Sequence, residues 1–409
     1  MAQLAILDHL GCALRGLNEP LVNITANEFL GRPLTADDLL PIGESSHTIA
    51  DSQQAMLHGM AAHAIDFDDT MVPAHAAHIG AGVISGVLTL ARANPDLSGQ
   101  AIVAAIVAGY ETNVRVAQLL HSDHYQNGFH STSSIGMFGV AAACAHLLGL
   151  TVEQTQMALG LAATQAAGIK NMFGTMAKPF NAGNTASSGV LAAKLVSGGF
   201  TAPFDSLEGH NGYLGLFEGL SAEKRIIAPT NQYFILQNNY KFHAACLWTH
   251  GTIDGIVKMR EQHGFLVADV EKLDIRVHPI LRKSAAVGTP LSGLDCKFSY
   301  SQIGAYALAG YDTAADETYS DAILADETIN ALRQKVTATA DPSLDLAVTE
   351  LAVALTDGRQ IEFTYDSSYG PEYVVEVEPR LIEKYMGNAE PVLGKAGATA
   401  LLDYVLNLA

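Results

Sequence analysis

Apolar residues recur at helical spacing through roughly the first 260 positions of the chain. Many of these segments carry Ala and Gly on more than one face. Small side chains let helices approach closely, so the pattern predicts a buried helical bundle. The predicted helices cover residues 4–17, 52–67, 78–93, 101–120, 133–148, a segment that opens at Thr151, 186–197 and 248–262.

The pattern changes near residue 265, where apolar and polar residues begin to alternate. Alternation over 273–277, and again over 351–355 and 361–363, predicts strands. Asp357-Gly358 stands between the last two strands, and Asp-Gly between alternating runs is a strong hairpin signal.

A helical run at 301–311 lies among these strands, and an Ala/Leu helix at 395–408 follows them. The sequence therefore predicts a mainly α protein with a smaller α+β domain. The expected organisation is an all-helical domain over 1–262, joined by 385–409, and an α+β lid over 265–384.

Charge and composition narrow the class of partner. The chain of 409 residues is 49% hydrophobic and only 16% charged, with a formal net charge of −19. Its 23 Lys and Arg residues form no cluster. Nucleic acid and anionic membrane surfaces are therefore not expected partners, and an anionic substrate would need a local basic pocket.

Other features of the sequence indicate a cytoplasmic protein. The first residues lack a basic segment before an apolar stretch, so no signal peptide is expected. The nearest approach to a membrane span, 101–110, is too short and is followed by Glu111. The cysteines lie far apart, which predicts reduced and buried thiols at Cys12, Cys144, Cys246 and Cys296.

The segment richest in candidate chemistry is His63-Ala-Ile-Asp66-Phe-Asp68-Asp69-Thr70. On a helix, His63, Asp66 and Thr70 share one face, while Asp68 and Asp69 point elsewhere. Acidic groups at a helix C-terminus oppose the helix dipole, so local stability does not favour them. Three interpretations remain: a solvated acidic helix end, a divalent-metal cluster, or a catalytic cluster beside a pocket.

Three histidines follow in positions that suit proton transfer. His75 and His78 come soon after the acidic segment, and His130 stands in a loop before an apolar helix. A helix N-terminus is a natural anion site, so His130 could bind a carboxylate or move a proton. The alternative is a plain capping loop in which His130 is incidental.

Lys178 is the most unusual cation. It lies in a stretch with little other charge, and Pro179 predicts that it lies outside any helix. Asn184 is expected to cap the helix that follows. A lysine beside a Gly-containing loop and a helix start suits an anion, although a solvated surface lysine is the simpler alternative.

A second cation, Lys241, opens an apolar run that also holds His243 and His250. Charged and polar groups are costly if they are buried without partners. His250 opens a predicted helix and, taken alone, fits a core histidine with satisfied hydrogen bonds.

Together these segments resemble the MmgE/PrpD family in order and spacing. That family includes 2-methylcitrate dehydratases, cis-aconitate decarboxylases and iminodisuccinate epimerases. The HAxDFDDT segment is quite specific, and the others are individually weak. The matching segments are Leu7-Asp8 with Gly11-Cys12-Ala13, then 63–70, 128–133, 177–183, 241–250, 292–294 and 297–299.

The resemblance implies a helical domain, an α+β lid, a homodimer, and an active site between the domains with no obligatory cofactor. The family's active-site residues carry over to Asp66, Thr70, His130, Lys178 and Lys241. His78 matches the histidine after the acidic motif, with His75 competing for that role, and Tyr300 or Gln302 matches a lid position. This chain departs from the family where His78 is followed by Ile79 instead of Pro, and at the run His243-Ala244-Ala245-Cys246.

The expected chemistry is proton abstraction next to a carboxylate of a small polycarboxylate. Lys178 and Lys241 would neutralise the carboxylates, and His78 and His130 would carry protons. Asp66 would orient a histidine or serve as the base, with Thr70 hydrogen-bonding either the substrate or Asp66. His63, His75, His243 and Tyr300 are further candidates for substrate binding.

A dehydratase-type lyase is the favoured function, with an epimerase or isomerase, or a decarboxylase, as alternatives. Two functions of other classes compete with it. One is a metal-dependent enzyme that uses Asp66, Asp68 and Asp69. The other is a non-catalytic helical scaffold, in which the lysines and histidines need not converge.

Overall fold

A computed structural model describes residues 1–41, 49–120, 123–218, 231–367 and 373–408. Its contacts divide the chain into two compact units. Unit 1 comprises Met1–Tyr240 and Val374–Ala409, and unit 2 comprises Lys241–Tyr373. Unit 2 is therefore inserted into the sequence of unit 1.

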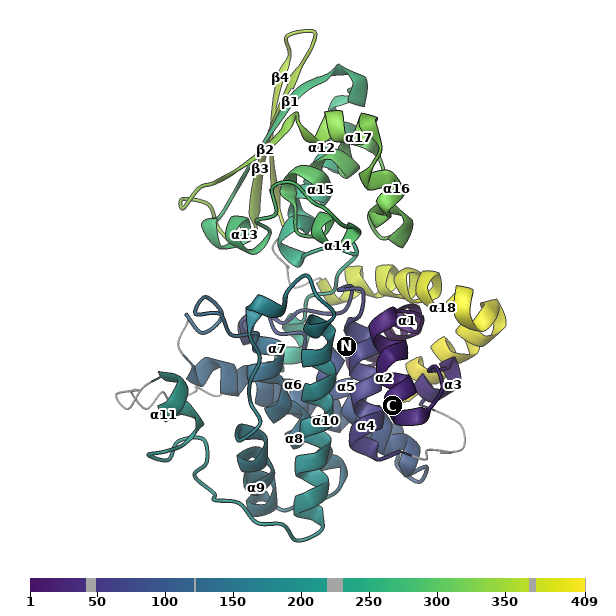
Figure 1. Cartoon of the computed structure of the whole chain (residues 1–409), viewed down its shortest axis with the longest axis vertical. Helices are drawn as coiled ribbons and strands as arrows, with labels where there is room; N and C mark the ends of the chain where they lie inside the picture. Colours follow the sequence, from purple (N-terminus) through teal and green to yellow (C-terminus); the bar gives the residue numbers. More distant parts are fainter. Residues whose placement is uncertain (42–48, 121–122, 219–230, 368–372, 409) are drawn as a thin grey trace. The chain divides into compact units, whose positions relative to one another are not determined.

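Unit 1 is a bundle of helices (Figure 1). Its core is rich in Ala and aliphatic side chains, as the apolar pattern predicts, and also buries aromatic rings such as Tyr110, Phe138 and Tyr385. The longer helices are α1 (Ala2–Gly16), α2 (Pro20–Leu30), α4 (Asp51–His63), α5 (Ile79–Ala93), α6 (Gly99–Leu119), α8 (Gly136–Leu147), α9 (Val152–Ala163), α10 (Ala177–Ser197) and α18 (Tyr373–Leu406). Shorter helices are α3 (Ala36–Leu39), α7 (Ser131–Ser134) and α11 (Tyr213–Glu218), with 3₁₀ turns at Val72–Ala74, Lys170–Met172 and Phe234–Gln237.

Helices α4 and α10 pack closely because glycines face each other at their crossing. A Cβ on Gly59 would lie 3.0 Å from the Cα of Gly183 and 3.1 Å from the carbonyl oxygen of Ala182. A Cβ on Gly183 would in turn lie 2.6 Å from the carbonyl oxygen of Met56. This contact brings the end of α4 beside the start of α10, and both positions carry candidate site residues.

The C-terminal helix returns to the helical unit, as expected. Residues of α18 from Val374 onward belong to unit 1, and Arg15 of α1 donates a hydrogen bond of 3.0 Å to Asn388 of α18. The helix kinks at Gly394, where φ is 68°. It is therefore two helical segments joined at a residue that tolerates the left-handed conformation.

Unit 2 is built on a four-stranded mixed sheet of order β2-β1-β3-β4, with α12, α15 and α17 on one face (Figure 1). The strands are β1 (Val270–Val277), β2 (Val336–Ala340), β3 (Val348–Leu355) and β4 (Gln360–Asp366). Its helices are α12 (His250–His263), α13 (Pro279–Ser284), α14 (Gly293–Cys296), α15 (Tyr300–Ala309), α16 (Asp321–Leu324) and α17 (Glu327–Arg333), with 3₁₀ turns at Leu247–Thr249, Val267–Asp269 and Asp316–Tyr319.

The sheet register follows the alternation read from the sequence. β1 pairs with β3 antiparallel, with Leu273 opposite Val353, and alternate residues of β3 are buried. β3 and β4 form the hairpin predicted from Asp357-Gly358, and Gly358 has a φ of 88°. Strand β2, which pairs with β1 in parallel, was not predicted.

Two predicted element boundaries were wrong near the site. The helix expected over 52–67 ends at His63, and the helix expected to start at 186 begins at Ala177. The second unit starts at Lys241 rather than near residue 265, because α12 packs on β3 and β4. Among the described residues, no helix is both long enough and apolar enough to cross a bilayer.

Candidate active site

The acidic segment leaves helix α4 at His63 and continues as a loop. Asp66 adopts a left-handed backbone with φ of 56°, a conformation that aspartate tolerates better than most residues. The prediction that His63, Asp66 and Thr70 share a helix face was therefore wrong. Non-glycine residues held in this region cost about 1–3 kcal/mol and cluster at functional sites.

Lys178 lies in the first turn of α10, not outside the helix as predicted from Pro179. Proline is tolerated there because the first turn has no intrahelical partners for its N–H groups. The Lys178 side chain is buried, and its Nζ donates to Oδ1 of Asp66 at 2.6 Å and to Nε2 of His63 at 2.8 Å. The close α4–α10 packing thus places a buried ammonium between a carboxylate and an imidazole.

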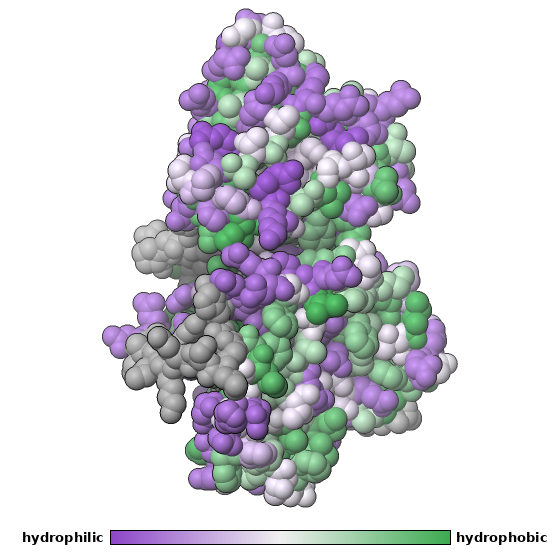
Figure 2. All heavy atoms as spheres, turned by 60° about the vertical axis from the view of Figure 1, so that its left-hand side comes forward, coloured by the Kyte–Doolittle hydropathy of each residue, from purple (hydrophilic) through white to green (hydrophobic). Residues whose placement is uncertain are grey.

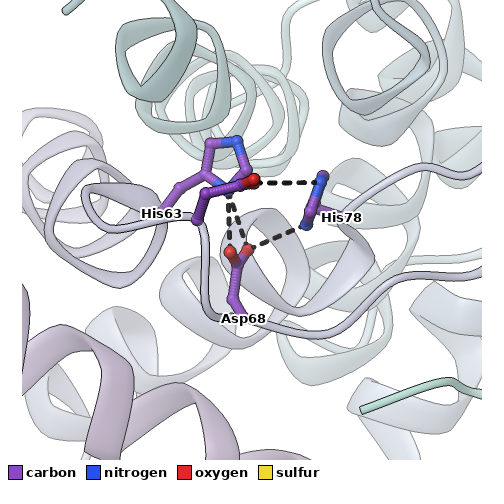
Figure 3. A group of neighbouring side chains, drawn as sticks. His63, Asp68 and His78 are labelled. Carbon is purple, nitrogen blue, oxygen red and sulfur yellow. Dashed lines mark hydrogen bonds and ion pairs between the residues drawn. The ribbon is translucent and has the colours of Figure 1, made fainter. Parts of the chain in front are cut away.

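Asp68 lies between two imidazole rings (Figure 3). Nδ1 of His63 lies 2.8 Å from Oδ1 and 2.9 Å from Oδ2 of Asp68. Nδ1 of His78 lies 3.3 Å from Oδ2 of Asp68, and Nε2 of His78 lies 3.8 Å from Oδ1 of Asp66. The prediction that Asp68 points away from His63 was wrong, because the chain leaves the helix before Asp68.

Burial and charge set the protonation of this cluster. Burial lowers the pKa of His78 to about 3, and burial together with the charge of Lys178 lowers the pKa of His63. Burial opposes ionisation of Asp68, but the two imidazoles outweigh it and hold the pKa of that carboxyl well below its usual range. His63 is therefore neutral at pH 7: its Nδ1–H donates to the Asp68 carboxylate, and its Nε2 accepts from Lys178.

His130 is the N-cap residue of α7 and lies beside the same cluster. Its ring centroid is 6.2 Å from that of His63, and Nδ2 of Asn181 lies 3.1 Å from its Nδ1. Because an amide nitrogen only donates, Nδ1 accepts and the ring proton resides on Nε2. Burial first, and then the charge of Lys178, lower the pKa of His130 well below its usual range. A buried neutral imidazole therefore carries an Nε2–H group without a hydrogen-bond partner among the described residues.

Two more side chains border the cluster. The Phe173 ring packs edge-on against His130 at 5.0 Å between centroids, and Nζ of Lys178 lies 5.4 Å from the Phe173 ring centroid. Thr70 is buried, and its Oγ1 has no hydrogen-bond partner in the described part of the chain. A hydroxyl left unpaired in a buried position is costly unless a ligand or water bonds it.

Two candidates of the same region are turned to other partners. The carboxylate of Asp69 accepts from the N–H of Gly80 at 3.0 Å, the hydroxyl of Tyr110 at 2.6 Å and Nδ2 of Asn238 at 2.8 Å. Burial, followed by the charges of Asp68 and Asp8, raises the pKa of Asp69 to about 7. Nε2 of His75 lies 2.9 Å from the Ala117 carbonyl oxygen, so this ring bonds to the end of α6.

The remaining candidates belong to unit 2. Lys241 is buried, and His243 lies with Nδ1 2.7 Å from the Thr313 hydroxyl and Nε2 3.3 Å from Asp254. His243 also borders a cavity of about 520 Å³ within unit 2. Tyr300 is buried and its hydroxyl donates to the Trp248 carbonyl at 2.7 Å.

The cluster in unit 1 also carries a set of metal-ligand types. His63, Asp66, Asp68 and His78 offer ligand atoms that lie within 4.8 Å of one another. The ammonium of Lys178 already bonds two of these four residues, so a metal ion there would have to displace it or overcome its repulsion. Asp69 is not in this set, so the predicted metal ligands Asp66, Asp68 and Asp69 do not converge.

The structure thus brings together Asp66, His63, His78, His130 and Lys178. Asp68 was predicted only as a ligand of the alternative metal site, and Asn181 and Phe173 were not predicted as site residues. The acidic motif itself contained the signal for Asp68, but the assumed helix turned it away. Asn181 and Phe173 carry no local signal, because their role arises from contacts with residues distant in sequence.

The sequence matches the models of both domains of one protein family. The MmgE/PrpD N-terminal domain matches residues 1–224, and the MmgE/PrpD C-terminal domain matches residues 243–409. Cis-aconitate decarboxylase from Aspergillus terreus (strain NIH 2624 / FGSC A1156) is 25% identical, over 100% of this chain and 88% of the relative. Human (Homo sapiens) cis-aconitate decarboxylase is 25% identical, over 98% and 86%. The 2-methylcitrate dehydratase of Escherichia coli (strain K12) is 26% identical, over 95% and 85%.

Proposed function

Because the chain belongs to the MmgE/PrpD family, we propose that it is a lyase that acts on a small di- or tricarboxylate by moving a proton next to a carboxylate. The relatives named cis-aconitate decarboxylase and 2-methylcitrate dehydratase support lyase chemistry on such acids. Dehydration is the first candidate for the reaction. Decarboxylation is the second candidate, and the relatives named cis-aconitate decarboxylase support it.

One observation carries the proposal. A buried ammonium, Lys178, lies 2.6 Å from a carboxylate and 2.8 Å from a neutral imidazole. A second neutral imidazole, His130, has no hydrogen-bond partner for its Nε2–H within the described ranges. The ammonium can hold a substrate carboxylate and stabilise the charge that develops on it. Neutral imidazoles and a carboxylate can donate and accept protons at neutral pH.

In the proposed dehydration, Asp66 takes the proton from the carbon next to the carboxylate. The electron pair of that C–H bond forms the carbon–carbon double bond, and the bond from the β carbon to its hydroxyl oxygen breaks. The Nε2–H of the neutral His130 donates a hydrogen bond to the leaving oxygen. Protonated Asp66 then passes its proton to that oxygen, which departs as water, and Asp66 regains its carboxylate. Asp68 holds His63 in its neutral tautomer so that His63 accepts from Lys178, and Thr70 hydrogen-bonds the substrate.

Further parts of the proposal rest on the family. Lys241 serves as the second carboxylate-binding cation, and no cofactor is needed because side chains supply both charge and protons. The chain forms a homodimer, which exposed apolar side chains on one face of α10 support: Phe180 is 44% and Leu191 41% exposed. The face of unit 1 drawn in Figure 2 carries apolar side chains among polar ones. A cytoplasmic location is supported by the cysteines, which are free and buried as predicted.

The experiment is incubation of the protein in D₂O with a panel of di- and tricarboxylates, followed by NMR, with and without EDTA. An alkene product with loss of water supports the dehydratase, and release of CO₂ supports the decarboxylase. Deuterium at the α carbon without a new product would instead indicate an epimerase. Activity that EDTA removes and Mg²⁺ restores would contradict cofactor independence, and inertness toward the whole panel would refute the lyase.

A further inference from the structure

The acidic loop is also held by two charged residues from the terminal helices α1 and α18. Nζ of Lys384, on α18, donates to Oδ1 of Asp8, on α1, at 2.5 Å and to the carbonyl oxygen of Phe67 at 2.6 Å. The same Nζ lies 4.0 Å from the centroid of the Phe67 ring. The Lys384 and Asp8 side chains are only 4% and 2% exposed.

The pair contacts the backbone on both sides of Asp68. Lys384 binds the carbonyl of Phe67, and Asp8 accepts from the backbone N–H of Asp69. These are the peptide groups immediately before and after Asp68. We call this arrangement the Asp8–Lys384 clamp, because a donor and an acceptor fix the two peptide planes between which the Asp68 side chain projects.

Stability alone does not account for such a pair. Burial raises the pKa of Asp8 even though Lys384 opposes the shift. Burial by itself would lower the pKa of Lys384, and Asp8 outweighs it, so that the pKa is raised. Burying two charges costs several kcal/mol each, and replacing a buried pair by apolar residues is often neutral or stabilising. A role in specifying geometry is the better explanation of the clamp.

Geometry matters at this point of the loop because Asp68 determines the state of His63. The Asp68 carboxylate accepts from Nδ1 of His63, which leaves Nε2 to accept from Lys178. A shift of Asp68 would loosen His63 and, through it, the ammonium. Positional errors of about 1 Å at such groups can cost roughly 100-fold in rate.

We propose that Asp8 and Lys384 are positioning residues, which set the backbone at Asp68 and thereby the tautomer and orientation of His63. The inference rests on the proposed function, since it assigns a second layer to the same site. Neither residue touches the reacting groups, so both act through the loop. Lys384 thus gives the C-terminal helix an indirect, positioning role at the site.

The test is the double variant Asp8→Leu/Lys384→Met, which removes both charges together with the acceptor and the donor of the clamp, and leaves no unpaired buried ion. It should fold, with a melting temperature near that of the wild type, and its kcat should fall about 100-fold with little change in KM. The acid limb of its pH–kcat profile should shift, because His63 loses its fixed tautomer. The single variant Lys384→Arg, which keeps a charged donor, should recover part of kcat.

Gln3→Leu is the matched control. It removes another α1–α18 hydrogen bond, from Nε2 of Gln3 to the carbonyl oxygen of Leu406, which involves no residue of the loop, and kcat should stay at the wild-type value. A double variant with wild-type kcat and pH profile would overturn the proposal. So would one that cannot fold, because the pair would then be a stabilising element.

Hydrogen exchange separates this inference from the proposed function. The amides of Asp68 and Asp69 should exchange faster in the double variant than in the wild type, whether or not a substrate is known. If the wild type is inert toward every acid but these amides exchange faster in the double variant, the proposed lyase function is refuted. The positioning role of the Asp8–Lys384 clamp is then still supported. Unchanged protection of both amides would refute the clamp alone.

Discussion

Substitution of Lys178 by methionine removes the charge at the centre of the site and keeps most of its apolar volume. In the wild type, Nζ bonds Asp66 at 2.6 Å and His63 at 2.8 Å with both partners buried. Removing one member of a buried ion pair costs about 3–5 kcal/mol, because the other charge stays buried without its partner. For a chain of 409 residues the melting temperature should fall by roughly 3–6 °C.

The catalytic loss should exceed what instability explains. Removal of a charge that stabilises the developing negative charge costs about 100- to 1,000-fold in rate, so kcat/KM should fall by that factor at temperatures far below melting. The double variant Lys178→Met/Asp66→Asn removes both charges and should regain most of the stability while staying inactive. Differential scanning calorimetry and initial-rate kinetics measure the two effects separately.

A second lysine supplies the control for this comparison. Lys194 and Asp51 form an ion pair at the other ends of the same two helices, where the Lys194 side chain is 47% exposed. Lys194→Met should therefore cost less than about 1 kcal/mol and leave kcat/KM unchanged. Wild-type kcat/KM in Lys178→Met, despite a lowered melting temperature, would refute the reasoning and reduce Lys178 to a structural residue.

Two further predictions concern histidines. His130→Gln should lower kcat about 100-fold or more, because it removes the Nε2–H donor. The control His146→Gln, at an exposed position, should leave kcat unchanged. Equal rates for both variants across the pH range would show that His130 only caps its helix. His9 is buried, and burial lowers its pKa to about 3. Below pH 6.5 the imidazole is therefore protonated in the unfolded state but still neutral in the folded state. The free energy of unfolding consequently falls as the pH drops toward 3. Urea unfolding of His9→Asn should show a loss between pH 7 and pH 5 that is roughly 2 kcal/mol smaller than in the wild type; identical losses would contradict the assignment.

Periodicity predicted most of the fold, since the helical bundle and the β3–β4 hairpin arise from local patterns. The wrong predictions concern residues whose backbone conformation depends on contacts with residues distant in sequence. Asp66 takes a left-handed conformation that ends the helical pattern after His63, and Pro179 is accommodated within the first turn of α10. No sequence window reveals these features, because they depend on the contact of α4 with α10.

The candidate site was predictable only as a set of residue types. His63, Asp66, Lys178 and His130 could be named from their unusual places in the chain, and the structure brings them together. Lys384 could not, because a lysine in a C-terminal helix reads as an ordinary surface residue. Its burial depends on a partner, Asp8, that lies 376 positions away.

That separation has a consequence for how the protein is made. Asp8 leaves the ribosome early, and Lys384 follows only after the whole inserted unit 2 has been synthesised. At about 5–20 residues per second, roughly 20–75 seconds pass between the synthesis of Asp8 and the synthesis of Lys384. The acidic loop therefore acquires its final geometry only near the end of translation, and ribosome-bound chains that lack the last helix should be inactive even when the preceding helices have formed.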